Sequence, residues 1–211
     1  MRIFRALAVC GVSLLVAGAA GAQDHRPLSP RGTASTQVGG KWSPRANGEE
    51  TYSGGKWIDV DYGRPILRGR TDVFGSGADY GKKVYAGAPV WRAGANQTTR
   101  LHTEANLKMG GTEIPAGDYS LFVDLDQGKW TLIVSKQPFQ EKYDSSNKAA
   151  TWGAYNYDPK DDLVRVPMEV TQNPISVDEL TIGFADVTDQ GAKLGMAWGN
   201  TRATAEFTIV P

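Results

Sequence analysis

The sequence predicts an all-β protein: a single antiparallel β-sandwich or jelly-roll-like domain with a flexible N-terminal leader. Three observations support this fold class. Apolar residues alternate with polar ones at two-residue spacing in several short segments, which is the pattern of strands that bury one face. Turn residues such as glycine and asparagine separate these segments. Throughout the domain the apolar residues follow the two-residue spacing of strands, rather than the spacing that forms an apolar stripe along a helix.

The N-terminal residues have the form of a bacterial export signal. Residues 1–5 are cationic, residues 6–16 are mostly apolar, and Ala20-Gly21-Ala22 fits the A-x-A pattern of a cleavage site. The apolar stretch is shorter than the roughly 20 residues that span a bilayer, and no later segment is apolar for that length. We therefore expect a signal peptide, residues 1–22, cleaved near Ala22. The protein would be exported to the periplasm or the extracellular space, without a transmembrane segment.

Length, cysteine content and charge limit the classes of protein to which the chain after residue 22 can belong. Its length suits one domain, and the chain's only cysteine, Cys10, falls within the predicted signal peptide, so we expect neither disulfides nor thiol catalysis. Lys and Arg total 23, as do Asp and Glu, and a nearly neutral chain has no general attraction for nucleic acids. Residues 23–55 are polar and glycine-rich and predict a flexible leader or covering arm, and residues 56–211 predict the β-sandwich domain.

The first strand candidates of this domain are residues 57–62, 98–103 and 106–109. The clearest pair follows at residues 119–125 and 130–134, where every second residue is apolar. The turn between them contains Gly128, which can take a positive φ, so we predict a hairpin. Residues 138–148 show no convincing apolar stripe and predict an irregular crossover or, at most, a short helix.

The C-terminal part predicts a meander of strands. Residues 163–170 are a strand candidate that Pro167 places at a sheet edge or a bulge, because proline cannot donate to a strand ladder. Residues 180–184, 194–198 and 203–209 alternate in the same way. The segments at residues 189–191 and at Gly199-Asn200 are interpreted as the turns between these strands.

Most familiar catalytic and metal-binding motifs are absent from the sequence. It contains no G-x-S-x-G pentapeptide, and the glycines and lysines of residues 75–83 do not fit a phosphate-binding loop. His25 and His102 are the only histidines, so we expect no transition-metal site. The acidic loop at residues 158–162 is interpreted as a solvated surface rather than a calcium site. We therefore assign no catalytic residue, no metal and no cofactor.

Arginine and aromatic residues gather in short phrases bracketed by glycine, and these phrases predict a binding site. Guanidinium groups beside aromatic rings can accept a planar anion or stack on a ring. The candidate ligand-binding residues are Arg64, Arg70, Trp91, Arg92, Asn96, Tyr155, Asp158 and Arg165. The alternative is a structural network, in which the arginines bind backbone carbonyls and pair with acidic residues of their own chain. Both interpretations stay open on the sequence alone.

The same phrases carry a resemblance to a known family. Residues 62–65 (YGRP), 90–96 (VWRAGAN) and 115–122 (PAGDYSLF) are the most specific, and residues 69–70 and 162–165 add to them. With these motifs the chain resembles the bacterial exported family called domain of unknown function 2911 (DUF2911), from about residue 29 to the last strand. The resemblance implies a secreted or periplasmic β domain and no established reaction.

The function favoured by these observations is a non-enzymatic binding or interaction module for a small polar, anionic or sugar-like ligand, or for an envelope component. An alternative is an envelope-associated hydrolase that uses Asp158 or Asp162 as acid or base while arginines hold an anionic group. A third possibility is a sandwich that associates through an exposed strand edge.

Overall fold

The computed structural model describes residues 27–210. The predicted signal peptide, residues 1–22, lies outside the described residues. Within residues 27–210, no helix is long and apolar enough to cross a membrane.

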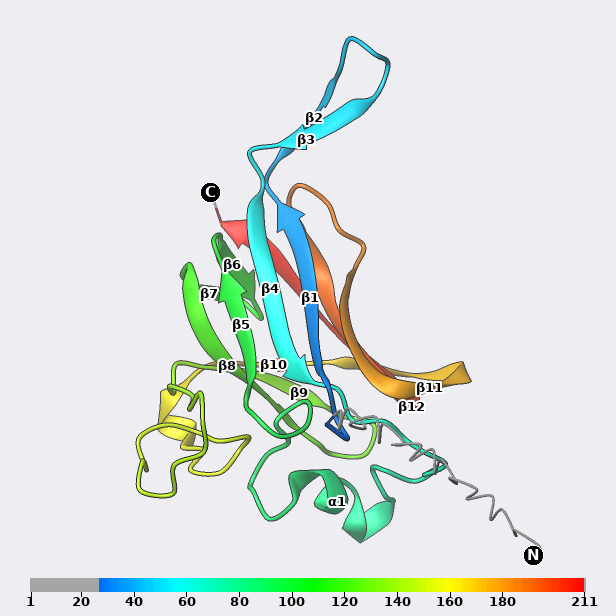
Figure 1. Cartoon of the computed structure of the whole chain (residues 1–211), viewed down its shortest axis with the longest axis vertical. Helices are drawn as coiled ribbons and strands as arrows, with labels where there is room; N and C mark the ends of the chain where they lie inside the picture. Colours follow the sequence, from blue (N-terminus) through cyan, green and yellow to red (C-terminus); the bar gives the residue numbers. More distant parts are fainter. Residues whose placement is uncertain (1–26, 211) are drawn as a thin grey trace, which may run out of the picture.

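The structure is an antiparallel sandwich of two sheets, as the sequence predicts (Figure 1). The six-stranded sheet has the order β1 (Arg31–Val38), β4 (Lys56–Gly63), β5 (Thr99–Thr103), β8 (Gly117–Asp124), β9 (Thr131–Ser135) and β10 (Asp162–Pro167). The four-stranded sheet has the order β11 (Glu169–Ala185), β12 (Gly191–Val210), β6 (Asn106–Met109) and β7 (Thr112–Ile114). A separate hairpin consists of β2 (Lys41–Pro44) and β3 (Glu50–Ser53). The helical turns are η1 (Gly77–Asp79), α1 (Lys82–Tyr85) and η2 (Pro159–Asp161).

The two-residue alternation places apolar side chains between the sheets. In the predicted hairpin, β8 pairs with β9 in the register Leu121↔Val134 and Val123↔Leu132, and all four of these side chains are buried. They pack in one core cluster with residues of the opposite sheet, which include Leu194, Met196 and Trp198. Burial of these side chains stabilises the sandwich by about 25 cal/mol per Å² of apolar surface.

The C-terminal meander differs from its prediction at one point. Gly199-Asn200 is not a turn, because β12 runs through it as one strand of 20 residues. β12 pairs with β11 along most of its length, and the register shifts on either side of the Val177↔Gly199 pair. Gly199 has φ +60°, so the glycine bends a continuous strand where the sequence pattern indicates a chain reversal.

Two predictions about the remaining chain are confirmed. Pro167 is the last residue of β10, and β10 is an edge strand of its sheet. At such an edge, the missing N–H of proline interrupts no row of hydrogen bonds between strands. Residues 138–148 form an irregular crossover without helix.

The folded part of the chain starts earlier than composition indicates. β1 lies in the segment expected to be a leader or covering arm, and it pairs with β4 from Arg31↔Gly63 to Val38↔Lys56. Only Ala34 and Val38 of this strand are buried, so it carries little apolar signal of its own. β1 covers the edge of β4 as a regular strand.

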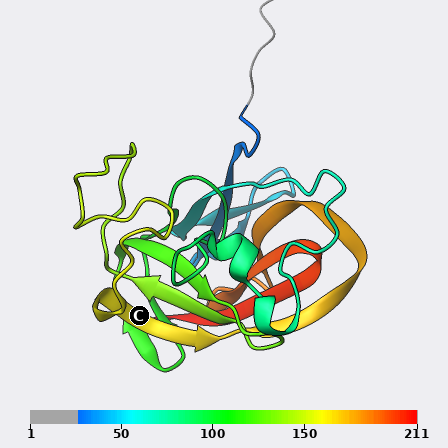
Figure 2. The same ribbon diagram turned by 90° about the horizontal axis from the view of Figure 1, so that it is seen from below.

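Long connections close one end of the sandwich. Figure 2 views the molecule from this end, where α1 and the loops around it cross below the sheets. A small second cluster of Ala88, Val90, Phe122, Ile133 and Ala154 packs on the outer face of β8 and β9, under these loops. The loop side chains are therefore held in place by packing, and the polar groups near them have defined positions.

Candidate functional site

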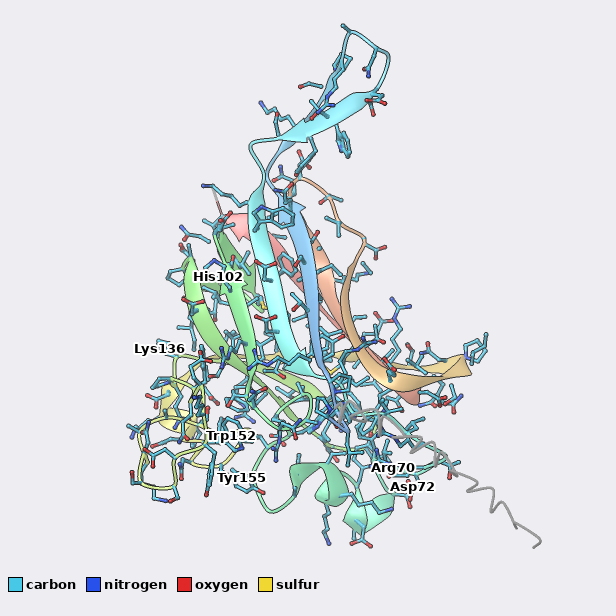
Figure 3. The ribbon with its side chains drawn as sticks, in the orientation of Figure 1. Arg70, Asp72, His102, Lys136, Trp152 and Tyr155 are labelled. Atoms are coloured by element: carbon cyan, nitrogen blue, oxygen red, sulfur yellow. The ribbon has the colours of Figure 1, made fainter. Side chains whose placement is uncertain are left out.

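The structure divides the predicted site residues among several separate sets of contacts. Figure 3 shows Arg70 and Tyr155 at the loop-covered end of the sandwich, on different parts of that end. Their hydrogen-bond partners differ as well.

Arg70 lines an open cleft of about 480 Å³. Its Nε donates to the carbonyl oxygen of Leu67 at 3.0 Å and its Nη2 to that of Ile66 at 2.6 Å, which fixes the direction of the side chain. Its guanidinium carbon lies 5.7 Å from the ring centroid of Trp198. The third nitrogen, Nη1, has no hydrogen-bond partner among residues 27–210. The remaining cleft residues are Gly69, Thr71, Asp72, Val73, Lys83 and Val84.

Lys83 is the second cation of this cleft. Its ammonium lies 3.1 Å from the backbone oxygen of Asp72 and 3.5 Å from the carboxylate of the same residue. Both side chains are about two-thirds exposed, so this pair contributes little to stability. The cleft thus combines two cationic groups and one carboxylate with the indole of Trp198.

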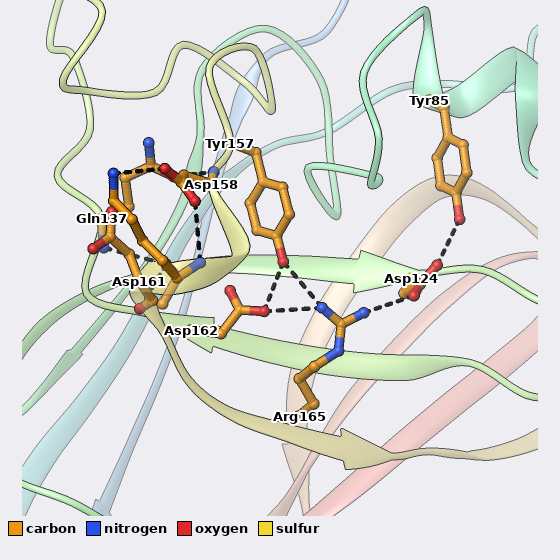
Figure 4. Close-up of polar contacts among 10 residues, drawn as sticks. Tyr85, Asp124, Gln137, Tyr157, Asp158, Asp161, Asp162 and Arg165 are labelled. Carbon is orange, nitrogen blue, oxygen red and sulfur yellow. Dashed lines mark hydrogen bonds and ion pairs between the residues drawn. The ribbon is translucent and has the colours of Figure 1, made fainter.

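Arg165 is the centre of the densest polar network (Figure 4). Its Nη2 lies 2.6 Å from Asp124, and its Nη1 lies 2.9 Å from Asp162 and 3.0 Å from the hydroxyl of Tyr157. Tyr157 donates to the same carboxylate oxygen of Asp162 at 2.7 Å, and Tyr85 donates to Asp124 at 3.1 Å. The guanidinium is therefore shared between two carboxylates of its own chain.

Asp162 depends on this network for the compensation of its charge. Its side chain is only 8% exposed, and its Oδ1 is buried without a hydrogen-bond partner among the described residues. Only Oδ2 is bonded, to Arg165 and Tyr157. A buried carboxylate with one free oxygen is costly unless its charge is paired, and Arg165 supplies the opposite charge.

The two tyrosines of the network keep their protons to high pH. Burial raises the pKa of Tyr85 to about 12, and the nearby Asp124 carboxylate adds to the shift. Burial also raises the pKa of Tyr157 well above its ordinary value, with the hydrogen bond to Asp162 as the next cause. Both hydroxyls therefore act as hydrogen-bond donors at neutral pH.

These shifts predict alkaline destabilisation. The pKa of Tyr85 is 10.0 when unfolded and about 12 when folded, so the unfolded state loses its proton first. The free energy of unfolding is therefore at its full value below pH 10.0 and falls as the pH rises towards 12. We expect a loss on the order of 1 kcal/mol, after allowance for the exposed part of the ring. Urea unfolding between these pH values measures it, and a slope that Tyr85→Phe leaves unchanged would contradict the assignment.

Arg92, Asn96 and Tyr155 connect loops. Arg92 donates to the carbonyl oxygen of Asn96 at 2.9 Å, and its guanidinium lies 5.4 Å from the ring centroid of Tyr155. The Tyr155 hydroxyl donates to the carbonyl oxygen of Ala86 at 3.0 Å. The side-chain amide of Asn96 donates to the carbonyl oxygen of Ser29 at 3.3 Å. These contacts tie four segments of the chain together.

Arg64 and Asp158 are each paired within the chain. Arg64 Nη2 lies 2.7 Å from the carboxylate of Glu179, which joins the end of β4 to β11. Asp158 accepts from the backbone N–H of Lys160 and lies 2.6 Å from its ammonium. The hydrogen bond from Lys160 lowers the pKa of Asp158, so this carboxyl is ionised at neutral pH and is a poor general acid.

Trp91 packs inside the sandwich. It is 1% exposed, and its ring stacks on that of Trp198 at 6.4 Å and meets Phe74 and Trp130 edge to face at 5.6 and 5.9 Å. Trp198 is thus contacted by Trp91 within the core and by Arg70 at the cleft. Trp91 supports the cleft from below and does not reach its surface.

The carboxylates relevant to a hydrolase, Asp158 and Asp162 together with Asp59 and Asp118, lie in two different places. Asp59 and Asp118 occupy register positions on either side of His102, on β4, β5 and β8. Asp158 caps the N-terminus of η2, and Asp162 is the first residue of β10. Among residues 27–210, no group of three or more His, Cys, Asp or Glu side chains is arranged to hold a metal ion.

Of the residues that line the cleft, sequence reasoning proposed only Arg70 as a ligand-binding residue. The sequence analysis considered Lys83 only as a mismatch to a phosphate-binding loop, and it placed Trp198 only at the end of a predicted strand. The usable signal was the concentration of Arg68, Arg70, Lys82 and Lys83 in one glycine-rich stretch of irregular chain.

Comparison with protein families places the chain in a known family. A family model described as "Protein of unknown function (DUF2911)" matches residues 43–207. No curated protein and no solved structure matches the chain.

Proposed function

Because the chain belongs to the DUF2911 family, whose function is unknown, we propose a function from its own side chains: an exported, non-enzymatic protein that binds a small organic anion in the Arg70 cleft. The observation that carries this proposal is the unpaired Nη1 of Arg70. Arg64 and Arg165 have carboxylate partners in their own chain, whereas Arg70 is held by two carbonyl oxygens and has no carboxylate partner among residues 27–210.

The dimensions and chemistry of the cleft suit such a ligand. A volume of about 480 Å³ falls within the roughly 300–1,000 Å³ of small-molecule sites. Arginine is the side chain best suited to bind carboxylate or phosphate in a fixed direction, and Arg70 is already oriented by its two carbonyl bonds. Little conformational entropy is lost when an anion binds to a group that is already held.

The other residues of the cleft narrow the class of ligand. Two cations and one carboxylate, Asp72, give a modest positive charge, which favours a monoanion or a dianion over a polyanion. The indole of Trp198 and the side chains of Val73 and Val84 offer an apolar wall beside the charged groups. An aromatic carboxylate or an aryl phosphate combines both features.

Export is part of the proposal. Its support is the cationic start, the apolar stretch and the Ala20-Gly21-Ala22 pattern of the N-terminal residues. Recovery of the protein only from the cytoplasm, with residues 1–22 still attached, would contradict this part.

Binding can be tested directly with phthalate, phenyl phosphate and citrate. We expect calorimetric titration to show binding of the aromatic anions, and Arg70→Ala to weaken it by about ten- to a hundredfold, since hydrogen bonds to charged groups contribute about 1.5–3 kcal/mol. Arg45→Ala removes an exposed arginine at the opposite end of the molecule and is the matched control. The proposal is wrong if neither phthalate nor phenyl phosphate binds, if citrate binds more tightly than both, or if Arg70→Ala binds the aromatic anions as the wild type does.

A further inference from the structure

A second candidate site lies at the other end of the molecule. The hairpin of β2 and β3 projects beyond the sandwich at the end opposite α1 (Figure 1). Between this hairpin and the loop that joins β11 to β12 is a groove of about 920 Å³. Its lining residues are Gln37, Gly40, Lys41, Trp42, Tyr52, Val187, Thr188 and Asp189.

The hairpin side of the groove is an aromatic pair. Trp42 and Tyr52 face each other directly in the register of β2 and β3, with ring centroids 5.3 Å apart. Trp42 is 66% exposed, although tryptophan is usually largely buried. Val187, on the opposite wall, is 44% exposed. Large apolar side chains that share one exposed groove mark a binding surface more often than scattered single residues do.

Both walls of the groove are fixed to the domain. The Tyr52 hydroxyl accepts a hydrogen bond from the backbone N–H of Gly40 at 2.8 Å, and its ring lies so close to Gly40 and Gly55 that neither position has room for a Cβ. The backbone N–H of Gly39 donates to the carbonyl oxygen of Asp189 at 3.0 Å, which ties the hairpin base to the opposite loop. The aromatic pair is therefore held in position without being buried, as in a preorganised site.

Unpaired polar side chains surround the aromatic pair. Among residues 27–210, the side chains of Gln37, Lys41 and Asp189 form no hydrogen bond and no ion pair. The amide of Gln37 both donates and accepts, Lys41 donates, and Asp189 accepts. Lys41 and Asp189 carry opposite charges, so the groove has no net charge that would select an ion.

We propose that this groove binds a neutral oligosaccharide. A sugar ring has an apolar face of C–H groups that packs on an exposed indole, and its rim of hydroxyl groups both donates and accepts hydrogen bonds. Trp42 supplies the indole, and Gln37, Lys41 and Asp189 supply both kinds of partner. The groove is larger than the Arg70 cleft, which favours an extended chain of sugars over a single one. This site is separate from the proposed anion site and does not depend on it.

The test uses the whole chain that follows the predicted signal peptide. Cellohexaose, chitohexaose and maltohexaose are the probes in calorimetric titrations. We expect at least one of these hexasaccharides to bind, and Trp42→Ala to weaken its binding at least tenfold. Because Trp42 is mostly exposed, Trp42→Ala should melt at the temperature of the wild type. Arg70→Ala should leave sugar binding unchanged, which separates this proposal from the anion site.

The matched control is Tyr143→Ala, because Tyr143 is an aromatic residue of similar exposure, 64%, that does not line the groove. It should bind the sugar as the wild type does. The proposal is overturned if no hexasaccharide binds the wild type, if Trp42→Ala retains full binding, or if both variants lose it equally. Binding of an extended apolar peptide that Trp42→Ala abolishes, with no sugar bound, would also overturn it and identify a peptide groove.

Discussion

Trp91→Ala is expected to lower the free energy of unfolding by about 3–5 kcal/mol, the largest single effect we predict. Trp91 is 1% exposed and contacts Phe74, Trp130 and Trp198. Removing its indole leaves a cavity where these aromatic rings meet. The surrounding rings belong to β12, to the residue before β9 and to the loop after β4, so they can collapse only partly into the space.

Urea unfolding followed by circular dichroism measures this effect. Trp57→Ala is the control, because Trp57 is 45% exposed and its removal should cost less than about 1 kcal/mol. If Trp91→Ala cost no more than Trp57→Ala, Trp91 would not be a core residue, and its assignment as support for the cleft would fail.

Arg165→Ala is expected to produce the second largest effect, a loss of about 2–3 kcal/mol. The substitution leaves the carboxylate of Asp162, which is 8% exposed, with the Tyr157 hydroxyl as its one remaining partner from the network. The loss should stay below that of a fully buried pair, because Arg165 and Asp124 are 40% and 47% exposed. Arg165→Lys should recover only part of it, since lysine cannot bond both carboxylates in the same plane.

A second substitution separates charge from packing at this site. If the loss arises from the uncompensated carboxylate, Asp162→Asn added to Arg165→Ala should restore part of the stability. Unfolding of the single variants and of the double variant in urea gives the coupling energy. Additive effects would show that Arg165 and Asp162 are not coupled and would contradict the assignment of the loss to the Asp162 carboxylate.

The parts of the fold that the sequence predicts are those whose side chains alternate strongly. In β8 and β9 the alternating residues Leu121, Val123, Leu132 and Val134 pack in the main core, and the turn between the strands contains Gly128 with φ +77°, so pattern and turn agree. β12 shows the limit of the same reasoning. Gly199 permits either a turn or a bend, and its pairing with β11, which decides between them, is not visible in local sequence.

The N-terminal strands are the parts that sequence reasoning did not predict. β1 is an edge strand with two buried residues, and its partner β4 rather than its own composition holds it in the sheet. A signal for the hairpin of β2 and β3 was present at Asn47-Gly48, where Gly48 takes φ +84° in the turn. It was hidden by the polar character of the segment around it.

The candidate site was predictable as a set of residue types but not as an arrangement. Arg64 and Arg70 occur in similar glycine-containing phrases that do not say which of them has a partner, whereas one partner of Arg165, Asp162, lies three residues away in the sequence. Glu179 and Asp124, which pair with Arg64 and Arg165, lie far away in the sequence. Only the fold shows that Arg70 faces an open cleft while the other two are bound within the chain.

The central claim is that the Arg70 cleft, rather than the Arg165 network, receives the anionic ligand. Titration of isotope-labelled protein with phenyl phosphate, followed by amide chemical shifts, tests it most directly. We predict that the shifts concentrate on Gly69 to Val73 and on Lys83 and Val84, the residues that line the cleft. Shifts centred instead on residues 155–165, or an unchanged spectrum at saturating phenyl phosphate, would contradict it.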